Sequence, residues 1–213
     1  MKNFLSESEL ETVRLAWTKK LNGKASMTAR TLGELNTCSF SMLLLPTGGG
    51  SLVLSSGHKS GVSWEEEFLK EAKTSGQAIF EFEPNGMRST CEKLLAGEMR
   101  ALALDAAKNR LDDVADEKAM RHTELMNRSI RRRDTKEGYA HMLDLISFSE
   151  DYKNAFLRLL NMRNEAFVSV LEQRHSKLDN GSIFVMFGAL HLHGPNGVLA
   201  LLQAKGFHVI PSP

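Results

Sequence analysis

Residues 87–175 constrain the fold more than any other part of the chain. This long stretch contains no proline and only two glycines, Gly97 and Gly138. Both residue types interrupt helices, so their scarcity predicts an almost wholly helical region. Breaks between helices are expected near residues 111–112, 133–134 and 148.

The last helix of this region is expected to begin at a capping box and to run to about His175. Ser147 and Glu150 have the Ser-x-x-Glu spacing in which the two side chains satisfy each other's backbone N–H groups. We therefore expect Ser147 to cap this helix.

Short apolar runs on both sides of the helical region predict β-strands. Residues 78–82 precede the region, and residues 183–187 and 207–210 follow it. Runs of this length, bounded by Gly or Pro, are typical of strands covered on both faces. Residues 198–206 have helical spacing and end at a glycine. The sequence thus predicts an α/β fold, a small mixed sheet with a large helical insert between its strands.

Two further helices are expected in the N-terminal part of the chain. Ser6 and Glu9 form a capping box at the start of the first. The second, residues 64–75, begins with three glutamates, which suit the positive end of a helix, and Gly76 stops it.

The segment between these helices gives two conflicting predictions, one from its local pattern and one described further below. Residues 40–45 and 52–54 flank a proline and a run of glycines, which favours two strands and a loop.

No repeat or low-complexity linker interrupts the chain, so residues 1–213 are predicted to form a single domain.

Charge and composition favour neither nucleic acid nor a membrane as the partner. With 27 Lys and Arg against 26 Asp and Glu, the formal net charge is +1. The basic cluster at residues 128–133 is assigned to a solvated helix end. Cys38 and Cys91 belong to no disulfide or metal motif. The N-terminus has no secretory signal and no segment is long enough to cross a membrane, so a cytoplasmic location is expected.

Arg163 is the first residue with chemical interest. It falls on the apolar stripe of the last long helix, between Leu160 and Phe167. A guanidinium that faces the core needs a carboxylate, backbone carbonyls or an anionic ligand. Glu83, at the end of an apolar run, is the natural partner. The alternatives are a purely structural ion pair, or a guanidinium that reaches water along its stem.

Two histidines, His191 and His193, follow the predicted strand at residues 183–187. Residues two apart in an extended chain can point the same way, so the pair is a candidate for two zinc ligands. Glu83 or His58 would supply a third ligand. The alternative is that both are ordinary loop histidines that hydrogen-bond to the backbone.

The C-terminal region resembles the signature of one family. Gly188-Ala-Leu-His-Leu192, then Gly194-Pro-Asn-Gly197 and the helix at residues 198–206, are similar to the C-terminal motif of the TraB/GumN family, which is related to the TIKI metalloproteases. Arg163-Asn164 is similar to the Arg-Asn pair of that family, and residues 61–83 resemble its mid-domain segment. The resemblance runs in order from about Ser6.

The resemblance carries four functional positions to this chain: Glu83, Arg163, Asn164 and His191. His193 stands where the family usually has proline, so it is not a family ligand. The family's first motif, a Gly-x-x-His on an N-terminal strand, has no counterpart in this sequence, which is therefore expected to be a truncated or degenerate member. The resemblance also implies that residues 40–45 are helical, against the local pattern.

Three functions follow as hypotheses. The first is a non-catalytic, regulatory module that binds another protein, such as a plasmid-encoded fertility-inhibition factor acting on a rival transfer apparatus. No cofactor is expected in that case. The second is a metal-dependent hydrolase or peptidase with zinc or manganese on His191 and Glu83, helped by His193 or His58, and with Arg163 stabilising negative charge. The third is an anion-binding domain that uses the helix start at Gly197 with Arg163.

Overall fold

The structure is a computed structural model that describes residues 5–20, 64–82, 98–178 and 181–210. These residues form seven α-helices and one short 3-10 helix, η1 (Ala189–His191). The α-helices are α1 (Glu7–Lys20), α5 (Trp64–Thr74), α7 (Met99–Leu111), α8 (Asp113–Arg131), α9 (Thr135–Ile146), α10 (Glu150–His175) and α11 (Val198–Ala204).

The prediction of an α/β fold is wrong for the described part of the chain, which contains helices and extended segments but no β-strand. Residues 78–82, 183–187 and 207–210 run without strand pairing there. The physical reason lies in how the apolar side chains are buried. Phe82 and Phe187 pack on Phe167 of α10, with ring centroids 5.1 and 5.4 Å away. A helix face, rather than a neighbouring strand, thus packs against one side of the first two of these runs.

The predicted breaks of the helical region are confirmed. Asp112 separates α7 from α8 and accepts a hydrogen bond from the backbone N–H of Ala115 at 2.9 Å. Asp134 caps α9 in the same way through the N–H of Glu137, at 2.9 Å. Short polar side chains of this kind satisfy N–H groups that a helix start leaves unpaired.

The cap of α10 differs from the prediction by two residues. Ser149, not Ser147, is the N-cap, and its hydroxyl accepts from the N–H of Tyr152 at 3.2 Å. Ser147 instead ends α9, where its hydroxyl donates to the carbonyl of Leu143. The predicted end of the helix at His175 is confirmed.

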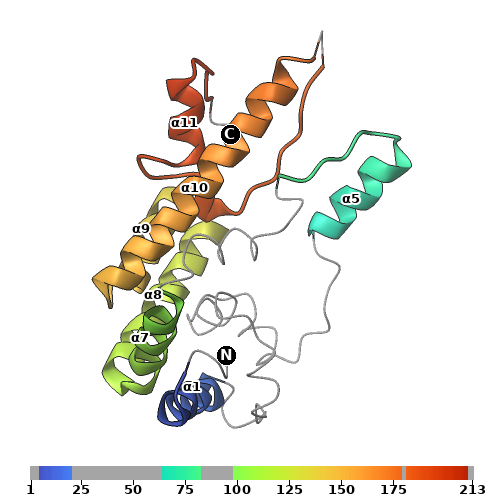
Figure 1. The fold of residues 1–213 in the computed structure, drawn as a ribbon. Coiled ribbons are helices and arrows are strands. Elements are labelled where there is room, and N and C mark those ends of the chain that lie inside the picture. The colour runs from blue at the N-terminus through green and yellow to red at the C-terminus, as the bar shows by residue number, and fades with distance from the viewer. Residues whose placement is uncertain (1–4, 21–63, 83–97, 179–180, 211–213) are drawn as a thin grey trace.

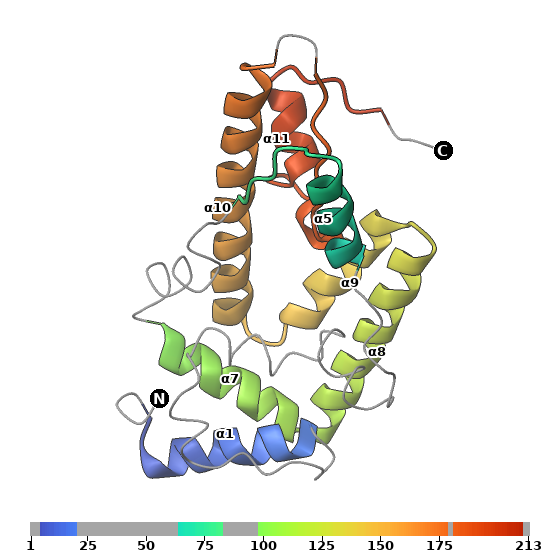
Figure 2. The same cartoon turned by 90° about the vertical axis from the view of Figure 1, so that its right-hand side faces the viewer.

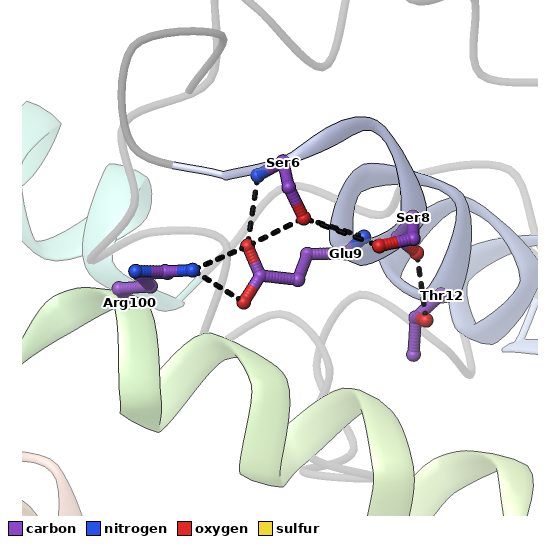
Figure 3. A network of polar contacts seen from close by, with 5 residues as sticks. All are labelled: Ser6, Ser8, Glu9, Thr12 and Arg100. Atoms are coloured by element: carbon purple, nitrogen blue, oxygen red, sulfur yellow. Dashed lines mark hydrogen bonds and ion pairs between the residues drawn. The ribbon is translucent and has the colours of Figure 1, made fainter.

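The capping box at the start of α1 is confirmed, and Figure 3 shows that it also joins α1 to α7. The backbone N–H of Ser6 donates to the Glu9 carboxylate at 2.8 Å, and Arg100 of α7 donates to the same carboxylate at 2.7 Å. These two interactions, with the Ser6 N–H the stronger, lower the pKa of Glu9 to about 2.

The core lies where α1, α7, α9 and α10 meet, while α8 pairs with α9 as a helical hairpin (Figures 1 and 2). Its most deeply buried large side chains include Val13 of α1, Met142 and Ile146 of α9, and Leu159 of α10. The last helix, α11, lies against α10. No helix in the described ranges is long and apolar enough to cross a membrane.

Candidate functional site: a histidine turn held by helices α9 and α10

The turn at residues 188–197 is a compact loop that the structure fixes at several points. Gly194 adopts a φ of +93°, and a Cβ there would lie 2.4 Å from the hydroxyl of Tyr139 on α9. A Cβ on Gly197 would lie 2.4 Å from the backbone carbonyl oxygen of His193. Glycine is therefore required at both positions, for backbone conformation and space at Gly194 and for space at Gly197.

Asn164 of α10 is the residue that links this turn to the helix. Its side chain is 0 % exposed. Its amide nitrogen donates to the backbone carbonyl of Asn196 at 2.8 Å, and its amide oxygen lies 2.6 Å from Nδ1 of His191. Since a carbonyl can only accept, the amide orientation is fixed, and Nδ1 of His191 must be the donor. The neutral imidazole then carries its lone pair on Nε2.

Arg163 lies beside this pair but not in the core. Its guanidinium stacks on the ring of Phe167 with Cζ 5.5 Å from the centroid, and the ring of His191 lies 5.2 Å from the same ring. The side chain is half-buried, whereas the neighbouring Asn164 takes the buried position. Arg163 and His191, two positions carried over from the resemblance, thus share one aromatic neighbour.

Glu83, the fourth carried-over position, lies outside the described residues, as do His58, Cys38 and Cys91. Phe82, the described residue before Glu83, packs on Phe167 and on Phe187, with centroids 5.1 Å away in both cases. The described part of the chain therefore brings Phe82 to the aromatic ring that also contacts Arg163 and His191.

His193 contacts a different helix from His191. Its Nε2 lies 2.6 Å from the hydroxyl of Thr135, the first residue of α9. Burial and the nearby Lys136 lower the pKa of His193 below its ordinary value, and Asp134 partly offsets this effect. His193 thus fastens the turn to α9 as Asn164 fastens it to α10.

The start of α11 is occupied by its own turn. The backbone N–H of Leu199 donates to the carbonyl of Leu192 at 3.3 Å, and the N–H of Gly197 donates to the carbonyl of Gly194 at 3.1 Å. At least one donor that an anion would use in the first turn of α11 is therefore committed within the protein.

Sequence reasoning missed the residues that hold the turn in place. Thr135 and Tyr139 carry no pattern that distinguishes them from other helix residues. Only the resemblance points to Asn164, because a polar residue on an apolar stripe has no motif of its own. Helical spacing places it among the buried Leu160, Phe167 and Val168, and a buried polar side chain in such a position indicates a specific hydrogen-bond partner.

The described structure is a helical bundle to which the buried Asn164 bonds a turn that carries two histidines. Comparison with known proteins identifies the family. The model of the TraB/PrgY/gumN family matches residues 7–211. The chain therefore belongs to this family, and the resemblance is confirmed. No curated protein and no solved structure matches the chain.

Proposed function

We propose that this member of the TraB/PrgY/gumN family is a non-catalytic, regulatory module that binds another protein. The observation that carries the proposal is a set of large apolar side chains exposed on α5 and on residues 181–188. Phe184 is 71 % exposed, and Met186 and Phe68 are 42 % and 39 % exposed. Exposed apolar side chains that gather in one place are typical of protein interaction surfaces.

These side chains form a defined surface rather than scattered positions. The rings of Phe68 and Phe184 lie 5.1 Å apart, so α5 and the extended segment contribute to one place. Along this segment Ile183, Val185 and Phe187 are half-buried, while Phe184 and Met186 point outward. This alternation is the period of an extended chain, with one side packed on the protein and the other available to a partner. We name these two phenylalanines and the methionine beside them, Phe68, Phe184 and Met186, the aromatic surface.

Protein binding explains the contacts of Asn164 and His191 without a catalytic role for either residue. Both side chains hold the 188–197 turn against α10, and residues 181–188 lead directly into that turn. Asn164 also bonds the turn directly through the carbonyl of Asn196, so the turn next to the aromatic surface would stay in place without the His191 imidazole. The family's association with conjugative plasmids makes a component of a transfer apparatus the partner class that we expect first.

One observation favours the alternative function, a metal-dependent hydrolase. The bond from His191 to Asn164 places the imidazole lone pair on Nε2, which is how proteins orient a histidine that binds a metal or acts as a base. In this alternative, zinc or manganese is bound by His191 and Glu83, with His193 or His58 as a further ligand. Arg163 then stabilises negative charge.

Affinity purification from the native host separates the two functions. Tagged full-length protein is compared with Phe184→Asp, His191→Ala and the control Val114→Asp, which alters a side chain 79 % exposed on α8. Binding through the aromatic surface predicts one protein enriched by the wild type, by His191→Ala and by Val114→Asp, and lost with Phe184→Asp. Equal enrichment by all four, or hydrolase activity that His191→Ala abolishes, would contradict the proposal.

A further inference from the structure

Three side chains with metal-binding groups meet between α8 and α9, away from the histidine turn. His122 lies in the middle of α8, and His141 and Asp144 lie three residues apart on α9, a spacing that places both on one helix face. Each residue offers one ligand atom, and these atoms all lie within 4.8 Å of one another. The two imidazole rings face each other at an angle of 51°, with centroids 5.8 Å apart.

The two histidines share an unusual environment. In the described structure the Nδ1 atoms of His122 and His141 are buried and have no hydrogen-bond partner. Nδ1 of His122 lies 3.5 Å from the carboxylate of Asp144, which is within range of an ion pair but does not form a hydrogen bond. A buried polar nitrogen without a partner is destabilising, and two such nitrogens on facing rings require an explanation.

A bound metal ion would satisfy both nitrogens at once. Two imidazoles and one carboxylate are a ligand set that zinc takes in proteins, usually with water in the fourth position. Tetrahedral ligands about 2.0–2.1 Å from zinc lie about 3.3 Å from one another. Because the present separations are at most 4.8 Å, they need a closure of no more than about 1.5 Å on that basis. The Asp144 carboxylate is already 3.5 Å from His122, and its side chain is 58 % exposed and can rotate toward an ion.

We propose that His122, His141 and Asp144 form a zinc site that joins α8 to α9. The site is independent of the proposed protein binding and of any metal on His191. Its effect would reach the histidine turn through α9, because Thr135 and Tyr139 of the same helix contact His193 and Gly194. Zinc would thus hold in place the helix on which the turn rests.

Zinc titration of the full chain tests the proposal. Protein freed of metal with a chelator is titrated with Zn²⁺ in competition with a chromophoric chelator, and Co²⁺ is added separately to read the coordination number from its visible absorption. We expect one Zn²⁺ per chain, a four-coordinate Co²⁺ spectrum, and a higher Tm with zinc. His122→Ala and His141→Ala should each weaken binding by about tenfold or more.

Two controls keep the outcome interpretable. Asp144→Asn changes a side chain that is largely exposed, so it should fold and still weaken zinc binding even if a histidine variant does not fold. His175→Ala changes an exposed histidine of α10 and should leave binding unchanged. Absence of stoichiometric binding would overturn the proposal. So would binding that Asp144→Asn and a folded histidine variant leave intact, or binding that only His191→Ala removes.

Discussion

At the scale of single residues, Asn164 organises the candidate site. It is fully buried on α10, yet both polar ends of its amide are used, one by His191 and one by the carbonyl of Asn196. A buried amide with both ends satisfied costs little, whereas its removal takes a hydrogen-bond partner from two half-buried groups. This asymmetry makes Asn164 the most informative position to alter.

Asn164→Ala is expected to destabilise the protein by about 2–4 kcal/mol, since a donor on His191 and the Asn196 carbonyl both lose their partner. Asn161→Ala, one turn earlier on α10 at a half-buried position, is the matched control and should cost less than about 1 kcal/mol. Urea unfolding followed by circular dichroism measures both. Equal losses would show that the bonds of Asn164 contribute little.

His193 gives a prediction about pH. Burial and Lys136 lower its folded pKa below the ordinary value of 6.5. The unfolded chain therefore binds the proton more readily, and the contribution of His193 to stability is present above about pH 6.5 and is lost as the pH falls through the folded pKa. His193→Gln should reduce the rise of unfolding free energy between acidic and neutral pH. An NMR titration that gives His193 a pKa above 6.5 would contradict this sign.

Residue-scale prediction from sequence succeeded where a motif carries the information. The C-terminal signature pointed to the family and to His191, and the upstream Arg-Asn pair pointed to Asn164. His122 was not predicted as a ligand, because its neighbours His141 and Asp144 belong to another helix and their approach depends on how α8 folds back onto α9. No local spacing encodes that distance.

At the scale of elements, the histidine turn depends on glycines for two separate reasons, and one pair of variants distinguishes them. Gly194→Ala should cost about 3 kcal/mol, because it adds a clash with Tyr139 to the strain of a φ of +93°. Gly206→Ala meets the same kind of strain at a φ of +86° with open space around it, and should cost about 1 kcal/mol. Thermal unfolding of both variants checks the difference; similar values would mean that Tyr139 moves aside freely.

The cap of α10 gives a second test at this scale. Ser149→Ala should destabilise by about 1–2 kcal/mol, since it removes the cap on Tyr152 and a 2.7 Å hydrogen bond to Asp105. Ser147→Ala, which loses only a bond to a carbonyl of its own helix, should cost about 0.5 kcal/mol or less. Chemical denaturation of the two variants decides between the cap seen in the structure and the one that the sequence pattern indicated.

Helix boundaries were predictable and strands were not, for a physical reason. The breaks at residues 112, 134 and 147–149 follow from local polar side chains that satisfy helix ends. An apolar run such as residues 183–187 indicates only that its side chains favour burial. A helix face can bury them as well as a neighbouring strand can. The aromatic contacts to Phe167 therefore decided the outcome.

At the scale of the whole molecule, the protein joins a helical bundle to a C-terminal turn and an extended segment (Figures 1 and 2). The bundle holds α9 and α10, these helices hold the turn, and the segment leading into the turn carries the aromatic surface. Composition and charge could not predict this surface. The exposure of Phe184 depends on which side of the extended segment packs on α10.

The most direct test of protein binding through the aromatic surface is site-specific photocrosslinking in the native host. A photoreactive phenylalanine analogue replaces Phe184 in the full chain, and Val114 in a control. The account predicts one discrete crosslinked protein at position 184, none at position 114, and the same product when His191→Ala is added. No product at position 184, the same product at both positions, or its loss with a folded His191→Ala variant would contradict the account.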